Sequence, residues 1–397
     1  MRSARLHLVM AAFTLTLAAC GGGGGSSGTS GSTSSSGGSS TSSSSNGSST
    51  SSSSSGSSTS SGSSSSGSGS SSGTTQTTGW LYTKAGDNKI YVDGGSGESV
   101  WVGRGVNVDD LFLGGYNYTL WMATADAEAA LTATMTNLIA QWRPTLLRLS
   151  LDMSSYPTHV SWLSNPTQYR EPMERVINKI GESSGVYVMV TLRSDTSMSV
   201  CDANDDATCF PETATNAVYR ALVDSFANKP HVLFGLSNEP GGNVKTAPEL
   251  RQAMSAAVDA IRARERELGV PEHIVVVQGD NWTSTIDFYA AQPLTQTNVV
   301  YEYHSYPPTS SGYTFTNIPV IIGEYGGANW QGMSQSVADA FFRDIEAKKI
   351  SSLAWYFSPY SAVAPALLNV THDASQITPN SWGTIVRSYL LNPTQYQ

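Results

Sequence analysis

The feature of this sequence that most constrains its fold is a regular alternation of short apolar segments and longer amphipathic ones. Eight segments have the length and apolar content of strands: 100–108, 145–152, 186–192, 232–237, 273–278, 299–303, 319–323 and 352–357. Several of them, such as 274–277, are almost uninterrupted apolar runs, which suit strands covered on both faces of a parallel sheet. Segments with helical spacing separate most of them: 126–142, 170–182, 216–228, 248–268, 334–349 and 382–391.

This alternation predicts an α/β protein, either a doubly wound sheet or a closed barrel, and the count of eight strands favours a (β/α)8 TIM barrel. Residues 80–92, with a turn at 86–88, predict a short hairpin ahead of the barrel. We therefore expect three parts: an export signal over 1–20, a linker over 21–78 and a barrel domain over 79–397.

The first twenty residues have the pattern of an export signal. Basic residues precede an apolar run, 8–19, that is too short to span a bilayer. The run ends Leu17-Ala18-Ala19-Cys20, which resembles the lipobox of bacterial lipoproteins, in which the cysteine is lipidated. The resemblance implies an exported protein held by a lipid anchor alone at the bacterial outer membrane or cell surface. An ordinary signal peptide with an unrelated cysteine is the alternative.

Residues 21–78 are almost wholly Gly, Ser and Thr and contain nothing apolar to bury, so we expect a disordered tether. Cys201 and Cys209 lie in one polar stretch and would form a small disulfide loop in an exported protein, with two free thiols as the alternative. The net charge of −9 argues against nucleic acid as a partner and is compatible with a neutral polymer. No motif predicts a cofactor, a metal ion or an obligate protein partner.

Polar and aromatic residues close several of the predicted strands, and in a barrel such residues converge at one mouth. These strand ends read Leu147-Arg148-Leu149, Leu236-Ser237-Asn238-Glu239-Pro240, Tyr303-His304-Ser305-Tyr306, Ile322-Gly323-Glu324-Tyr325-Gly326 and Ala354-Trp355-Tyr356. Glu239 and Glu324 follow the fourth and seventh strands, which lie across a closed barrel from each other. Two carboxyl groups that face each other over a sugar are what a retaining glycosidase needs, one as acid/base and one as nucleophile.

The four motifs that contain Glu239, Tyr306, Glu324 and Trp355 resemble glycoside hydrolase family 5, the cellulase-type enzymes, over about residues 98–391. The resemblance implies a (β/α)8 barrel with Glu239 as the acid/base and Glu324 as the nucleophile. It further implies a set of residues that contact the substrate or the nucleophile: Arg148, Asn238, His304, Tyr306 and Trp355.

One position departs from the family pattern. Arg193 stands where the family usually has a histidine at the end of the third strand, which leaves the contacts of the cleavage subsite open and makes Arg193 itself a candidate substrate-binding residue. Trp282 and Trp330 follow the fifth and seventh strands and would either stack on sugar rings or pack internally.

The sequence thus predicts a retaining endo-acting hydrolase of a β-linked polysaccharide, with a β-1,4-glucan as the first choice. Mannan, xyloglucan and xylan remain open, because loops build the outer subsites. The alternative is a surface polysaccharide-binding lipoprotein with weak catalysis on the same barrel, and Arg193 is the residue that favours it.

Overall fold

The computed structural model describes residues 78–93, 97–110, 124–152, 162–163, 166–194, 210–240, 246–361 and 363–397. The chain divides into two compact units, Met1–Thr74 and Thr75–Gln397, and every described residue belongs to the second. Cys20, Cys201 and Cys209 lie outside the described residues, as does nearly all of the expected linker, so lipidation, the disulfide and the tether stay predictions. No helix in the described part of the chain has the length and apolar character needed to cross a bilayer.

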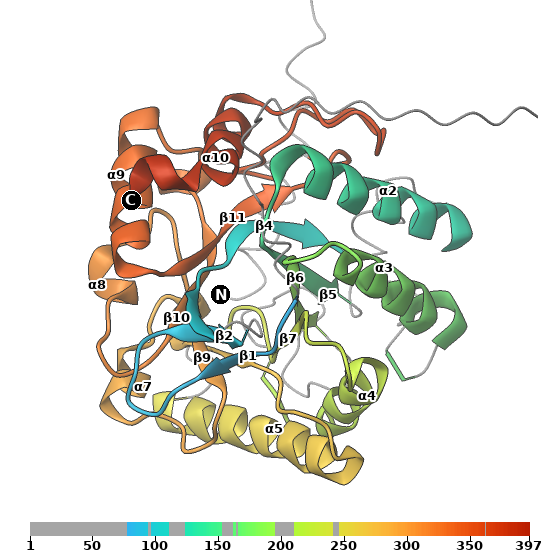
Figure 1. Ribbon diagram of the computed structural model, residues 1–397, viewed down its shortest axis with the longest axis vertical. Helices are drawn as coiled ribbons and strands as arrows, with labels where there is room; N and C mark the ends of the chain where they lie inside the picture. The colour runs from blue at the N-terminus through green and yellow to red at the C-terminus, as the bar shows by residue number, and fades with distance from the viewer. Residues whose placement is uncertain are drawn as a thin grey trace, which may run out of the picture. The chain divides into compact units, whose positions relative to one another are not determined.

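Eight parallel strands close into a barrel, which confirms the predicted fold class (Figure 1). They are β4 (Arg104–Asp109), β5 (Leu146–Asp152), β6 (Tyr187–Ser194), β7 (Val232–Gly235), β8 (Val275–Gln278), β9 (Val299–Ser305), β10 (Val320–Tyr325) and β11 (Ser351–Phe357). Each strand pairs with its neighbours in the chain, and β11 pairs with β4 to complete the circle. The carboxyl ends of all eight strands therefore meet at one mouth.

Helices surround the barrel. The α-helices are α2 (Thr124–Trp142), α3 (Glu171–Gly181), α4 (Asn216–Phe226), α5 (Ala247–Leu268), α6 (Asp280–Thr283), α7 (Asp287–Ala291), α8 (Ser310–Tyr313), α9 (Gln335–Lys348) and α10 (Ser381–Leu391), with single turns of other helix types at Pro166–Arg170, Ala328–Trp330 and Pro393–Tyr396. The longest, α5, has clear sequence signals at both ends: Thr246 and Glu249 form a capping box, and Gly269 ends the helix in a left-handed conformation.

A three-stranded antiparallel sheet covers the amino ends of the barrel strands. It consists of β1 (Leu81–Thr83), β2 (Ile90–Asp93) and β3 (Glu98–Trp101), so the predicted hairpin is present with one further strand. The predicted strand 100–108 is wrong as one element: β3 ends at Trp101, and the barrel strand β4 begins at Arg104. Gly103 lies at the break, where a Cβ would come within 3 Å of both Trp101 and Leu146.

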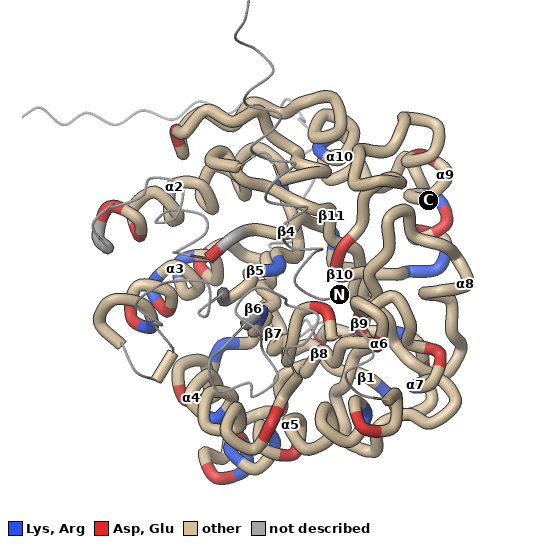
Figure 2. Tube along the Cα trace, turned by 180° about the vertical axis from the view of Figure 1, so that it is seen from behind, with Lys and Arg blue, Asp and Glu red and all other residues tan. Residues whose placement is uncertain are grey.

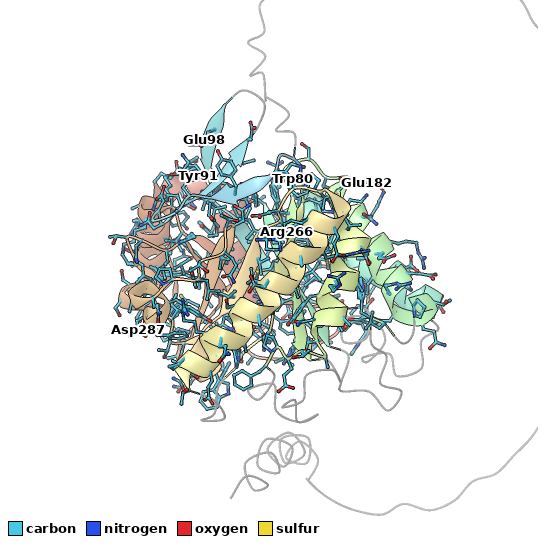
Figure 3. All side chains as sticks on the ribbon, turned by 90° about the horizontal axis from the view of Figure 1, so that it is seen from below. Trp80, Tyr91, Glu98, Glu182, Arg266 and Asp287 are labelled. Atoms are coloured by element: carbon cyan, nitrogen blue, oxygen red, sulfur yellow. The ribbon has the colours of Figure 1, made fainter. Side chains whose placement is uncertain are left out.

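Apolar side chains of this sheet fill the lower barrel together with residues from the strand starts: Leu81, Ile90, Val92 and Trp101 pack with Leu146, Tyr187, Met189, Leu233, Ile274, Val276, Val300, Ile321 and Leu353. Figure 3 shows Tyr91 and Glu98 on the part of this sheet that projects from the barrel. Because successive side chains of a strand alternate between its faces, Arg148 faces inward two positions after Leu146, and Glu302 two after Val300. The interior is therefore apolar near the sheet and polar toward the mouth.

Strand β10 contains an irregularity directly before Glu324. Ile322 pairs with Tyr303 and Glu324 with His304, so β10 has one extra residue, Gly323, relative to β9. Such a β-bulge reverses the alternation of side chains beyond it. Ile322 and Tyr325 both pack outward into the core under the helices, and Glu324 is thereby directed inward beside His304.

Candidate active site

The structure brings Glu239 and Glu324 together at the mouth of the barrel. A carboxylate oxygen of each, together with a ring nitrogen of His304, lies within 4.8 Å of the others. Glu324 is buried on β10, and Glu239 follows β7 with 17 % of its side chain exposed. Figure 2 shows most other charged residues on the outer helices, whereas β5 and β10 carry charge inside the helical ring.

Glu324 is held by two donors, one on each carboxylate oxygen. Arg148 Nη1 donates to Oε1 over 3.0 Å, and the Tyr306 hydroxyl donates to Oε2 over 2.6 Å. Both donors are residues that the sequence analysis placed in this site. Donors fixed on both oxygens stabilise the ionised form and orient the carboxylate.

Glu239 has a different environment. Its Oε1 atom lies 2.9 Å from His304 Nδ1, and the same ring nitrogen is 3.8 Å from Glu324 Oε1. The backbone of the preceding residues is fixed by side-chain hydroxyls, since Tyr219 donates to the Leu236 carbonyl and Thr283 to that of Asn238. His304 thus stands between the two glutamates, as its predicted place at the end of β9 requires.

Arg148 is the centre of a buried network that also contains residues the sequence reasoning missed. Its Nη1 donates to Asn107 Oδ1 over 2.9 Å, and its Nε lies 2.7 Å from Glu302 Oε1. Glu302 also faces His304 Nε2 at 2.9 Å and accepts a hydrogen bond from Gln278. The signal for Glu302 was its position two residues before His304, which places both side chains on the same face of β9.

Electrostatics couple these groups strongly. Burial alone would lower the pKa of His304, but the charge of Glu324 and the hydrogen bonds to Glu239 and Glu302 outweigh it and raise that pKa to about 9. Burial works to raise the pKa of Glu302, yet the charges of Arg148 and His304 hold it below its usual value. For Glu324, burial and the charge of Glu239 raise the pKa, against the opposing effects of His304, Arg148 and Tyr306.

Three further predicted residues line the same region. Arg148 Nη2 donates to Asn238 Oδ1 over 2.8 Å, so the amide NH2 of Asn238 is the end that can donate to a sugar hydroxyl. Trp355 lies on β11 with 8 % exposure, and the guanidinium of Arg193 is 5.9 Å from the centre of its ring. Arg193 therefore reaches the site by stacking on the predicted sugar platform.

Trp282 and Trp330 are not internal packing. Trp330 is 57 % exposed and its ring centre lies 4.7 Å from that of Tyr306, while Trp282 is 46 % exposed and its backbone N–H donates to Pro240 directly after Glu239. Both have positive φ, which is uncommon for large residues and tends to mark functional loops. Beside Trp330 lies a surface groove of about 840 Å³ between the segments that follow β10 and β11.

Glu239, His304 and Glu324 also have donor atoms close enough to surround a cation. Both ring nitrogens of His304 already face carboxylates, Nδ1 toward Glu239 and Nε2 toward Glu302. A metal would have to displace one of these hydrogen bonds, so the arrangement suits the transfer of protons better than the ligation of an ion.

Comparison with known proteins gives one family. The model of the cellulase family, glycosyl hydrolase family 5, matches residues 105–361. The endoglucanase of Clostridium saccharobutylicum is 21% identical over 238 residues, which is 57% of this chain and 49% of that protein. Endoglucanase N of Pectobacterium atrosepticum is 22% identical over 45% of this chain and 39% of its own length. The chain thus matches about half or less of these relatives' length.

Solved structures agree on the fold. A β-glucanase of Saccharophagus degradans in complex with cellotetraose is 19% identical, with a TM-score of 0.60 over 80% of this chain and 94% of that one. The catalytic domain of an endoglucanase from Thermobifida fusca is 18% identical, with a TM-score of 0.58 over 78% and 97%. At these identities, the likeness extends to the barrel architecture alone.

Proposed function

Since this chain belongs to glycosyl hydrolase family 5, the cellulase family, we propose that it hydrolyses a β-linked glucan internally, with retention of anomeric configuration. The observation that carries the proposal is the approach of Glu239 to Glu324 within 4.8 Å. Retaining enzymes have their two carboxyl groups about 5 Å apart, whereas inverting enzymes need room for a water molecule and separate them by about 6.5–9.5 Å.

In the first step, the Glu324 carboxylate attacks the anomeric carbon and forms a glycosyl ester. Glu239 donates a proton to the glycosidic oxygen at the same time, so that the leaving sugar departs as an alcohol. Arg148 and Tyr306 hold the attacking carboxylate in place from both of its oxygens. The amide of Asn238 is positioned to donate to a hydroxyl of the bound sugar.

In the second step, Glu239 is a carboxylate and accepts a proton from water. The water oxygen attacks the anomeric carbon, the bond to Glu324 breaks, and both carboxyl groups return to their starting states. Two inversions leave the product with the configuration of the substrate. Trp355 would support the ring during both steps, with Arg193 on its flank.

The first experiment is product analysis on a panel of glucan, mannan, xyloglucan and xylan. We expect reducing sugar from β-1,4-glucan, and the β-anomer as the first product by ¹H NMR. Glu239→Gln and Glu324→Gln should each lower kcat by about 10³-fold or more, because each removes one half of the acid/base and nucleophile pair. Asp287→Asn is the matched control, since this acidic residue begins α7 outside the site.

Two results would contradict the proposal. Undiminished activity in either glutamine variant would refute the catalytic role of the substituted glutamate. A first product of α configuration would exclude a retaining mechanism. Binding of a polysaccharide by the wild-type chain without turnover of any member of the panel would instead support the alternative, a binding lipoprotein.

We also propose that the chain is exported and anchored through Cys20, on the strength of the Leu17-Ala18-Ala19-Cys20 sequence. A lipid-anchored chain would sediment with membranes and partition into detergent. A Cys20→Ala variant that stays with the membrane fraction would argue against this anchor.

A further inference from the structure

Glu302 is a fully buried carboxylate for which the proposed reaction has no direct use. It sits behind His304 on β9, away from the space between Glu239 and Glu324. Burial of an ionised carboxylate costs several kcal/mol unless it is well paired, and an apolar residue of similar size is often as stable there. A residue that only filled space would therefore not need this charge.

The surroundings of Glu302 are built to keep it ionised. Arg148 Nε and His304 Nε2 both lie against Oε1, at 2.7 and 2.9 Å, and the Gln278 amide donates to Oε2. Gln278 is itself oriented, because its Oε1 accepts from the backbone N–H of Ser237 over 2.8 Å. The adjoining strand makes room for the carboxylate: a Cβ on Gly323 would lie 1.8 Å from Oε1.

An ionised carboxylate only accepts hydrogen bonds, so His304 Nε2 must carry a proton. The opposite nitrogen, Nδ1, then faces Glu239 at 2.9 Å. When Glu239 is protonated on Oε2, its Oε1 still accepts from the Nδ1–H of a charged ring. When Glu239 is ionised, the same Nδ1–H donates to the carboxylate. The ring makes both hydrogen bonds without turning.

We propose that Glu302 is a positioning residue whose buried charge fixes the orientation and the protonation of His304, so that Nδ1 remains hydrogen-bonded to Glu239 in both states of that carboxyl group. This inference rests on the proposed acid/base role of Glu239. After Glu239 gives its proton to the leaving oxygen, the imidazolium donates to the new carboxylate and stabilises it.

The charges around His304 are consistent with an imidazolium. Glu302 on β9, Glu239 after β7 and Glu324 on β10 are acidic, and among the described residues in this network they outnumber the cation Arg148 on β5. The other described members of this network, Gln278 on β8, the Tyr306 hydroxyl, Asn107 and Asn238, are neutral at ordinary pH. The pKa of His304, raised to about 9, agrees with a charged ring at neutral pH.

The test is a titration of the His304 ring in the full chain by ¹H–¹⁵N correlation, assigned among the six histidines with a His304→Gln variant. In the wild type we expect loss of the proton near pH 9. In Glu302→Gln, which keeps the shape and removes the charge, the transition should fall by roughly one pH unit or more. Glu302→Asp keeps the charge and should leave the transition high.

Kinetics supply a second measurement that a merely structural role would not affect in the same way. In Glu302→Gln, kcat at pH 8 should fall about tenfold or more. A loss of this size is within the rate enhancement that general acid–base catalysis contributes. KM should change little, and the optimum should move to lower pH, where His304 regains its proton. A loss that is equal at every pH would overturn the inference.

The outcomes separate this inference from the proposed function. If the chain cleaves glucan but the His304 transition is below pH 7 in the wild type, or is unchanged in Glu302→Gln, the role of Glu302 is refuted alone. If the chain cleaves no glucan, the ring titration still decides whether Glu302 controls His304. If Glu302→Gln does not fold, a wild-type His304 transition below pH 7 still refutes the role of Glu302.

Discussion

Arg148 illustrates how one residue type can organise a whole site. Its guanidinium reaches Glu302, Glu324, Asn107 and Asn238 from a fully buried position on β5. The planar fork of an arginine offers five N–H donors at fixed angles, which a lysine cannot reproduce. The two acidic partners offset the cost of burying its charge, and each is oriented by it in return.

The raised pKa of Glu324 gives a prediction for the acid side of the pH profile. A nucleophile acts as a carboxylate, so activity is lost as the pH falls through its pKa. Because burial and the charge of Glu239 raise that pKa above the usual value of 4.5, kcat/KM should already decline above pH 4.5. Initial rates on a soluble glucan between pH 3 and 8 measure this limb.

Tyr306→Phe is the matched variant for this prediction. The hydroxyl donates to Glu324 and lowers its pKa, so its removal should move the acid limb to still higher pH. We also expect kcat to fall by about tenfold, because a hydrogen bond to a charged group contributes about 1.5–3 kcal/mol. A limb that stays in place, or moves to lower pH, would contradict this account of the site.

The sequence was sufficient to predict the site residues that belong to recognisable motifs near the carboxyl ends of strands, and insufficient for Asn107 and Glu302. Glu239, His304 and Glu324 interrupt apolar runs at their carboxyl ends, where a barrel gathers its functional groups. Asn107 and Glu302 stand inside strands, and their inward direction depends on which face of each strand meets the barrel axis. That face is set by closure of the whole sheet, which a single strand sequence does not specify.

At the scale of elements, the bulge in β10 decides which way Glu324 points. The predicted strand ended at Gly323, and nothing in its apolar run indicated an additional residue relative to β9. The carbonyl of Gly323 is satisfied by Asn107 Nδ2 over 2.8 Å, so the irregular backbone loses no hydrogen bond. The segment 100–108 was predicted as one strand because its apolar pattern runs through the break between β3 and β4, which belong to different sheets.

Gly323→Ala directly tests the importance of the bulge in β10. The added methyl group would meet Glu302, whose side chain is fixed by Arg148 and His304 and cannot move aside freely. Disruption of a buried ion pair costs about 3–5 kcal/mol, so we expect a lower Tm and loss of most activity. Thermal unfolding followed by circular dichroism, with parallel assays, measures both.

The double variant Gly323→Ala/Glu302→Ala serves as the control. If the clash with Glu302 is the cause, the two losses of stability should be clearly less than additive, because the second change removes the obstructing carboxylate. Fully additive losses of stability would instead mean that Gly323→Ala acts by straining the backbone at that position.

At the scale of the whole molecule, Trp282 and Trp330 extend the site beyond the two glutamates. Trp330 adjoins the groove whose lining includes Met333, Pro365 and Leu368. We propose that these exposed rings stack on sugars far from the cleaved bond. Trp330→Ala should therefore lower kcat/KM on a long glucan from a few-fold to about tenfold, since an aromatic contact contributes about 0.5–1.5 kcal/mol.

Short oligosaccharides distinguish this role from a general loss of function. A substrate too short to reach Trp330 should be cleaved as by the wild type. Val337→Ala, which removes another exposed apolar side chain from α9 outside the groove, should leave both rates unchanged. Equal losses on long and short substrates would mean that Trp330 acts by positioning Tyr306 and not by binding a distant sugar.

If the chain is anchored through Cys20 as proposed, the residues that lead into the small sheet determine where a pulling force first acts on the barrel. Thr78 and Gly79 are hydrogen-bonded to Gly185 and Tyr187 at the start of β6, and Thr83 to Asn298 before β9. Tension transmitted along the preceding residues would therefore act first on these contacts, which lie at the opposite end of the barrel from Glu239 and Glu324. A force exerted by a surface to which the chain is attached would therefore change the distance between the two carboxylates only after these contacts had given way.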